Sequence, residues 1–306
     1  MQALEVDLGA EVLSASAPVG AGFGGQYAGT LSLGDGRRVF VKAAPAWIEF
    51  QASCLVLEAD ILSRLPIEVP HATPLADVAV SGWQLLAMEA VAGQMPGYPW
   101  SAPALDAAYR ACVAVSELAD PHAFTDRQWG AYFHGPDRHA ADLAAIGSRG
   151  YSRPLEHGRD DWVDGMVHAH GSELAELAHA SRDITGTTLL HNDVRPDNLL
   201  MDRSGRVVLL DWNWVCLGPA WVDFLGLLPL AHRQGIAIQQ WVTRPLFAGA
   251  DSEELDQVLA ALSVKMLGGH DQELAPGLPE AVWAHKLLFA HDTLRLLADR
   301  RGWTAP

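Results

Sequence analysis

The spacing of apolar residues changes along the chain, and it first predicts strands. Short apolar runs alternate with turns over the first ninety residues, and the Asp-Gly pair in "TLSLGDGRRVF" is a strong signal for a hairpin. Residues 49–65 then repeat apolar side chains at intervals of three and four, which is typical of a helix ended by the prolines that follow. "GWQLLAMEAVAG", residues 82–93, gives a further apolar strand that runs into a linker.

From about residue 101 the apolar pattern becomes helical. Residues 104–120 and 160–181 both have the periodicity of amphipathic helices, whereas residues 134–158 are polar and rich in glycine, proline and histidine, which indicates a loop or a broken helix. Residues 219–300 return to helical spacing. The pattern predicts an α+β, bilobal fold with a small β-rich lobe over residues 1–91 and a larger, mainly helical lobe over residues 92–306. A cleft between two such lobes is a favoured place for a ligand.

Charge and composition limit the classes of molecule that the protein is expected to bind. The formal net charge is −16, from 21 basic and 37 acidic residues, which excludes nucleic acid and anionic membranes as expected partners. Such a surface favours a cationic partner. The alternative is that the negative charge only keeps the protein soluble. No apolar run approaches the roughly 20 residues of a membrane span, the first residues do not resemble a signal peptide, and the three cysteines form no CxxC pair. We therefore expect a cytoplasmic protein.

The chemistry is concentrated in "LLHNDVRPDNLLMDRSGRVVLLDWNW", residues 189–214, where several acidic groups stand beside apolar runs. Asn198 follows Asp193 by five positions and Asp211 follows Asp193 by eighteen, across a tight turn and a strand that can bring Asp211 back beside the earlier loop. Like charges at low dielectric repel, so a positive partner is needed. The oxygens of Asn198 and Asp211 suit Mg²⁺ held jointly with phosphates, which leaves Asp193 to accept a proton from a substrate hydroxyl.

"HNDVRPDN" resembles the catalytic loop of protein kinases, and "LLDWNWVCLGPAWVDF" resembles the aminoglycoside phosphotransferase family of small-molecule kinases more closely. In that family an aromatic residue follows the metal-binding Asp, and a Gly-Pro turn and a further Asp come next, as Gly218, Pro219 and Asp223 do here. The resemblance implies a protein-kinase-like fold, ATP and Mg²⁺ as cofactors, and transfer of the γ-phosphoryl group to a hydroxyl of a small molecule. The negative net charge is compatible with a cationic acceptor. An aminoglycoside or another antibiotic is the expected acceptor, and antibiotic resistance is the expected role.

The same resemblance assigns residues of the N-terminal lobe. Lys42, placed at the end of a strand in "RVFVKAA", would hold the nucleotide phosphates, and Glu58 on the following helix would pair with it. The glycine run that includes Gly22, Gly24 and Gly25 would bring backbone N–H groups close to phosphates. Backbone groups between Glu89 and Val91 would meet adenine. An ordinary strand lysine and a solvated helix glutamate are the alternatives for Lys42 and Glu58.

The loop also departs from the family pattern. Asn192 stands where glycine is usual, and Arg195 stands where histidine is common. Arg195 can stabilise the transferred phosphoryl group, which makes it a catalytic candidate, or it can form a structural pair with Asp197 or Asp223. His191 is expected to brace the loop, and Asp223 to anchor it through backbone N–H groups.

Other functions stay open at this point. A kinase of a metabolite such as a sugar, an amino alcohol or a nucleoside fits the same motif, and so does a nucleotide-binding pseudokinase or regulatory module. A metal site at His168 and His170 lacks a third ligand motif. The acceptor, the preference for ATP or GTP and the oligomeric state are not readable from the sequence.

Overall fold

The computed structural model describes residues 2–16, 27–96, 99–133, 161–268 and 281–304. These residues form two compact units. The first unit holds the described residues up to 115 together with residues 193–215, and the second unit holds the other described residues. The α+β class expected from the sequence is confirmed, because an antiparallel sheet comes first and helices dominate afterwards.

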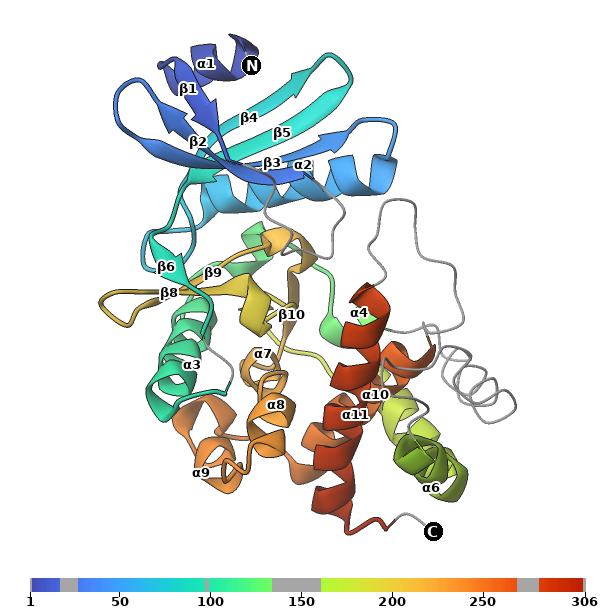
Figure 1. The fold of residues 1–306 in the computed structure, drawn as a ribbon. Coiled ribbons are helices and arrows are strands. Elements are labelled where there is room, and N and C mark those ends of the chain that lie inside the picture. Colours follow the sequence, from blue (N-terminus) through green and yellow to red (C-terminus); the bar gives the residue numbers. More distant parts are fainter. Residues whose placement is uncertain (1, 17–26, 97–98, 134–160, 269–280, 305–306) are drawn as a thin grey trace. The chain divides into compact units, whose positions relative to one another are not determined.

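A five-stranded antiparallel sheet forms the body of the first unit, in the order β1-β2-β3-β5-β4 (Figure 1). The expected hairpin joins β2 and β3, and Gly36 in its turn has a φ of 87°, which glycine adopts without strain. The strands are β1 Val12–Ala15, β2 Tyr27–Leu33, β3 Arg38–Pro45, β4 Pro74–Val80 and β5 Trp83–Glu89.

Two helices cover opposite faces of this sheet (Figure 1). Helix α1, Gln2–Leu8, was not expected from the sequence, and its Leu4 and Leu8 are buried in the same hydrophobic cluster as Val39 and Val41 of β3. Helix α2, Glu49–Arg64, agrees with the predicted helix and turns Glu58 inward with its apolar side chains. Because side chains alternate along a strand, Lys42 lies on the face opposite to Val39 and Val41, the face covered by α2.

A smaller sheet and a helix complete the first unit. Strands β6 Gly93–Gln94, β8 Leu199–Asp202 and β9 Val207–Leu209 pair in the order β6-β8-β9. Strand β9 is also tied to the chain that follows α2, since the Leu209 N–H donates to the carbonyl oxygen of Pro70 at 2.8 Å. Helix α3 spans Ala102–Ser116, within the region where a helix was predicted. The 3-10 turns η3 Pro196–Asn198 and η4 Trp212–Trp214 flank the β8–β9 hairpin.

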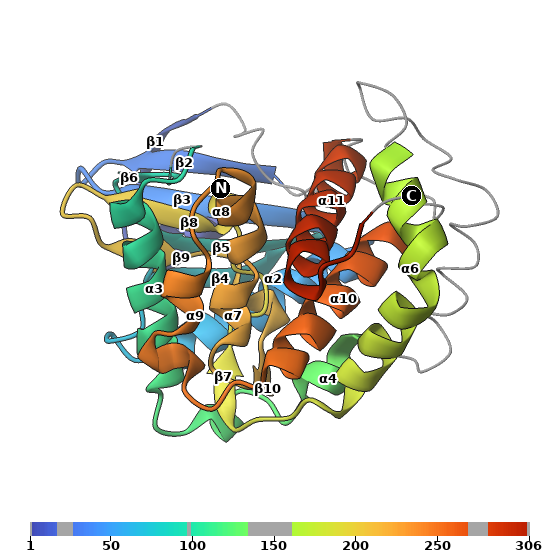
Figure 2. The ribbon, with the colours of Figure 1, turned by 90° about the horizontal axis from the view of Figure 1, so that it is seen from below.

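Helices dominate the second unit, in which α6, α10 and α11 lie side by side (Figures 1 and 2). Arg301 near the end of α11 links all three helices through ion pairs with Glu173, Glu253 and Asp256. The long helices are α6 Asp161–Ala180, α10 Ser252–Gly268 and α11 Ala281–Arg301. The shorter helices are α4 Trp129–Phe133, α7 Val222–Leu225, α8 Leu228–Arg233 and α9 Gln239–Val242. The 3-10 turns are η1 Pro121–Ala123, η2 Ser181–Asp183 and η5 Pro245–Phe247.

A two-stranded sheet, β7 Thr188–Leu190 and β10 Cys216–Gly218, lies in the second unit and leads into the loop that starts at His191. Gly186 is required beside it, because a Cβ there would stand 2.2 Å from the backbone carbon of Gly218. None of the helices in the described ranges is long and apolar enough to cross a membrane.

Candidate functional site

The loop after β7 is held by one buried carboxylate. Asp223, on α7, accepts hydrogen bonds from the backbone N–H groups of His191 at 2.7 Å and Asn192 at 2.8 Å. Asp223 is 5% exposed, and burial raises its pKa to about 6 against the two hydrogen bonds, which favour the ionised form. The expected anchoring contact of Asp223 with the loop backbone is thus present, and His191 is buried within the loop.

Asn192 has a left-handed backbone conformation, with a φ of 63°. This conformation costs most residues energy, but glycine adopts it freely and asparagine tolerates it better than most. The departure from glycine noted in the sequence is therefore compatible with the same turn.

Asp193 and Asn198 meet across the turn. The side-chain amide of Asn198 donates to the backbone oxygen of Asp193 at 2.9 Å and to its carboxylate at 2.7 Å, and this leaves the amide oxygen of Asn198 as a potential metal ligand. Burial raises the pKa of Asp193 to about 7. Arg195 opposes this shift, while Asp211 and Asp197 add to it by repulsion.

The β8–β9 hairpin brings Asp211 back to this loop, as its spacing from Asp193 predicts. Asn198 precedes β8, and the Leu210 N–H after β9 donates to the Asn198 carbonyl oxygen at 2.9 Å. Asp211 itself has a φ of 67°, a conformation that aspartate tolerates better than most residues. The buried indole of Trp212 fixes the next position through a hydrogen bond to the Leu209 carbonyl at 3.1 Å.

Lys42 lies between two carboxylates. Its Nζ donates to both carboxylate oxygens of Glu58 at 2.8 Å and also contacts Asp211. Burial alone would lower the pKa of Lys42, but Asp211 and Glu58 outweigh it and raise the pKa, so the ammonium group stays charged. The expected pairing of Lys42 with Glu58 is present. One detail was wrong: Lys42 lies inside β3 and not at its end, because pairing with β5 extends the strand as far as Pro45.

Arg195 is shared between two neighbours of the loop. Its Nε and Nη2 donate to the carboxylate of Asp197 at 3.0 and 2.9 Å, and its Nη1 lies 3.5 Å from a carboxylate oxygen of Asp193. The pairing with Asp197 was one of the two interpretations left open by the sequence. The guanidinium of Arg195 therefore lies beside the carboxylates of both Asp197 and Asp193.

A divalent cation fits this set of residues. In the part of the chain that the structure describes, two cations, Lys42 and Arg195, form ion pairs with four carboxylates, those of Glu58, Asp193, Asp197 and Asp211. Asn198 and Asp211 supply hard oxygens of the kind that Mg²⁺ binds. Across the described parts of the chain, no group of three or more His, Cys, Asp or Glu side chains could hold a metal ion by itself. Mg²⁺ needs few protein ligands when phosphates and waters complete its coordination.

The remaining predicted residues are placed as follows. Gly22, Gly24 and Gly25 lie outside the described residues. Glu89 ends β5 and is exposed, with its N–H bonded to the Thr73 carbonyl at 2.8 Å and its carboxylate accepting from the Thr73 hydroxyl. Val91 follows in the linker and accepts a hydrogen bond from Gly93 at 3.1 Å.

Sequence reasoning missed one group near the site. Cys54 lies one helical turn before Glu58 on α2; burial raises the pKa of its thiol, a hydrogen bond from Asn213 opposes the shift, and the charge of Asp211 adds to it. The interval of four residues between Cys54 and Glu58 was the available signal, because it places both on one face of a helix.

With this geometry in place, comparisons with known proteins identify the class. The model of the phosphotransferase enzyme family APH matches residues 31–262, so the chain belongs to that family and is a small-molecule phosphotransferase. A search of curated protein sequences gave no match.

Solved structures with the same fold support the kinase-like architecture. An aminoglycoside phosphotransferase in a ternary complex with ADP and hygromycin B has a TM-score of 0.63 at 13% identity, with 99% of each chain covered. An aminoglycoside phosphotransferase from Alicyclobacillus acidocaldarius has a TM-score of 0.55 at 17% identity, with 95% of this chain and 92% of that chain covered. A macrolide 2'-phosphotransferase from Brachybacterium faecium has a TM-score of 0.56 at 15% identity, with 94% and 95% covered.

Proposed function

We propose that this phosphotransferase uses ATP and Mg²⁺ to transfer the γ-phosphoryl group to a hydroxyl of a small molecule. The observation that carries the proposal is the position of Lys42 between Glu58 and Asp211 in the unit that also holds the Asp193–Asn198 pair. These are the groups that phosphoryl transfer requires: a cation for the phosphates, oxygens for a metal, and a carboxylate for the acceptor.

Each side chain then has one task. Lys42 binds the nucleotide phosphates, and Glu58 fixes the direction of its ammonium group. The oxygens of Asn198 and Asp211 hold Mg²⁺, which neutralises charge on the phosphates when bound. Asp193 orients the acceptor hydroxyl and takes its proton late in the transfer, and Asn198 keeps the Asp193 carboxylate in place. Backbone groups from Glu89 to Val91 contact adenine, and Gly22, Gly24 and Gly25 approach the phosphates.

Arg195 adds charge at the same place. Its contact with Asp193 puts the guanidinium next to the group that orients the hydroxyl, where it can stabilise oxygens of the phosphoryl group during transfer. The pair with Asp197 keeps the guanidinium plane fixed. Positioning and charge neutralisation supply most of the rate in such a reaction.

The acceptor that we propose is an aminoglycoside or another hydroxylated antibiotic, with resistance to that compound as the role. Two features support this choice: the net charge of −16, which attracts polycationic sugars, and the similarity in fold to proteins that bind hygromycin B or modify macrolides.

The test is nucleotide consumption by the full chain with Mg²⁺, measured across aminoglycosides, macrolides, nucleoside antibiotics, amino alcohols and sugars, with ATP and GTP in parallel. We expect ATP consumption that depends on one hydroxylated antibiotic, and a phosphorylated product in the mass spectrum. The Asp193→Asn variant is the control for contaminating kinases. Turnover of a sugar or an amino alcohol alone would contradict the antibiotic acceptor. ATP binding without transfer to any compound would contradict the enzyme mechanism.

A further inference from the structure

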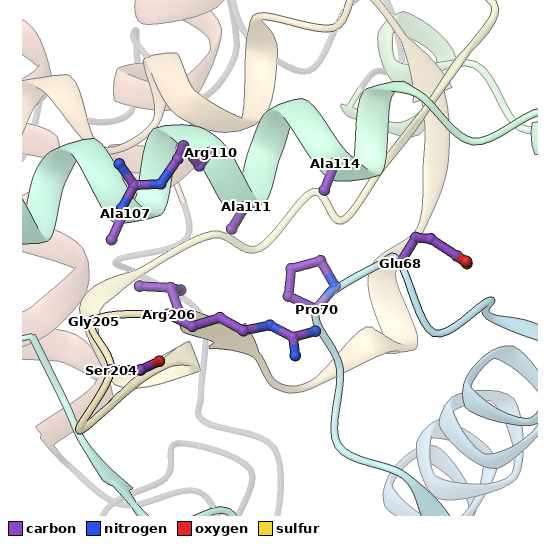
Figure 3. A pocket seen from close by; sticks show the side chains of 10 residues that line it. Glu68, Pro70, Ala107, Arg110, Ala111, Ala114, Ser204, Gly205 and Arg206 are labelled. Atoms are coloured by element: carbon purple, nitrogen blue, oxygen red, sulfur yellow. The ribbon is translucent and has the colours of Figure 1, made fainter.

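A pocket of about 310 Å³ lies in the first unit, lined by α3, the segment after α2 and the turn of the β8–β9 hairpin (Figure 3). Ala107, Ala111 and Ala114 share one face of α3, and Pro70 and Val207 add further apolar surface. Short alanine side chains leave room that larger residues would fill. The lining includes none of the residues assigned above to phosphoryl transfer.

The polar lining of the pocket is mainly basic. Arg206 extends from the hairpin turn to lie beside Pro70 (Figure 3). Hydrogen bonds within the same turn lower the pKa of Asp202, and the Arg206 charge adds to this shift, but within the described ranges its guanidinium forms no ion pair. Arg110 also lines the pocket, but it forms an ion pair with Asp106 one turn earlier on α3. Glu68 is directed away from Pro70 and Arg206 in Figure 3. Arg206 is therefore the charge available to a ligand.

We propose that this pocket binds a small organic monocarboxylate with a compact apolar body. The guanidinium of Arg206 matches the two oxygens of a carboxylate, and the alanine face with Pro70 receives the apolar part. The volume is at the lower end of the range for small-molecule sites. A dianion such as phosphate is disfavoured, because the second cation of the lining, Arg110, is already paired with Asp106.

The pocket touches the chain segments that position the candidate metal ligands. Its turn belongs to the hairpin that joins Asn198 to Asp211, and its Pro70 carbonyl accepts a hydrogen bond from Leu209, two residues before Asp211. This site is additional to the proposed function and does not depend on it, since the binding test uses no nucleotide and no acceptor.

The test is a titration of the full chain with benzoate, followed by saturation-transfer NMR, with benzamide as the uncharged probe of the same shape. We expect saturable binding of benzoate and binding of benzamide that is at least about tenfold weaker, because benzamide lacks the charge that Arg206 recognises. The Arg206→Gln variant should weaken benzoate binding by about tenfold. Arg203→Gln is the matched control, because it removes the same charge from the same turn outside the pocket and should leave the affinity unchanged.

A second variant tests the volume of the pocket and not its charge. Ala114→Leu fills the space beside α3 and should also weaken benzoate binding, whereas inorganic phosphate should compete weakly or not at all. Equal affinity for benzoate and benzamide, equal loss in both arginine variants, or tighter binding of phosphate than of benzoate would overturn the proposal. If Arg206→Gln does not fold, Ala114→Leu and the benzamide comparison still decide the question.

Discussion

The ammonium group of Lys42 donates to both carboxylate oxygens of Glu58, and the two side chains are 11% and 2% exposed. Because both side chains are buried, water cannot solvate either charged group when its partner is removed. The pair therefore links the stability of the sheet and α2 to the group proposed to bind phosphate.

Replacement of one partner should cost more stability than replacement of both. We expect Lys42→Met to lower the free energy of unfolding by about 3–5 kcal/mol, because it leaves the Glu58 carboxylate buried without its cation. The double variant Lys42→Met/Glu58→Met should lose much less, because no buried charge remains. Urea unfolding followed by fluorescence measures both values. A double variant that loses as much stability as Lys42→Met, or more, would show that the unpaired Glu58 carboxylate is not the cause of the loss.

Asp193 should matter for transfer and little for nucleotide binding. Asp193→Asn keeps the shape of the side chain but removes the proton acceptor, so we expect kcat to fall by about a hundredfold or more. The dissociation constant of ATP should change by less than about threefold, because the proposed phosphate contacts come from Lys42 and the metal ligands. Steady-state kinetics and calorimetry check the two quantities, with Asp202→Asn in the nearby hairpin as a control. Retention of more than a few per cent of turnover would refute the role of Asp193.

The two interpretations of Arg195 predict different results. If its charge acts on the phosphoryl group, Arg195→Gln lowers kcat by about tenfold or more because the positive charge is lost, while Asp197→Asn has a small effect. This is the outcome that we expect, since Arg195 also contacts Asp193. Equal losses of kcat in the two variants would indicate that Arg195 only holds Asp197. Single-turnover kinetics at saturating nucleotide separate this effect from binding.

Metal binding should require nucleotide. Since Asn198 and Asp211 offer few protein oxygens, we expect Mg²⁺ alone to leave the melting temperature almost unchanged. Mg²⁺ with a non-hydrolysable ATP analogue should raise it by about 5 °C at high saturation. The Asp211→Asn variant should lose this increase, and EDTA should reverse it in the wild-type protein. An equal increase in the variant would argue against Asp211 as a metal ligand.

Asp223 gives the stability a dependence on pH. Its pKa in the folded chain, about 6, is above the ordinary value of 3.8, so the folded state binds the proton more tightly than the unfolded state does. Its contribution is therefore largest below pH 4 and decreases as the pH rises from about 4 to 6, by up to about 3 kcal/mol. The Asp223→Asn variant does not titrate, and the difference between its unfolding free energy and that of the wild type isolates the effect. A flat difference between pH 4 and 7 would contradict the raised pKa.

The sequence predicted the β2–β3 hairpin, helix α2 and the loop motif well, because the signals for each of them are local. The Asp-Gly turn, the apolar spacing of α2 and the motif from Asp193 to Asp211 each depend on a few neighbouring residues, and the structure brings Asp193 and Asn198 together. Helix α1 was missed because it is short and its stability depends on packing of Leu4 and Leu8 in the hydrophobic cluster of the sheet.

The sequence left the contacts of Arg195 open between the phosphoryl group and a pair with Asp197 or Asp223, because these contacts depend on side-chain directions and not on spacing. The position of Lys42 inside β3 was missed for a related reason, since pairing with β5 decides where the strand ends. The pocket beside Pro70 is formed by three segments that are far apart in the sequence, so no local pattern indicates it.

The tip of the β8–β9 hairpin allows the chain to be modified without disturbing the chemistry. The ladder from Leu199↔Leu209 to Met201↔Val207 fixes the approach of the residues on either side, whatever the length of the connection beyond it. A peptide inserted between Ser204 and Gly205 should therefore leave the Asn198–Leu210 hydrogen bond intact. A reporter dye attached at this point would sense events at both ends of the hairpin from outside the reaction centre.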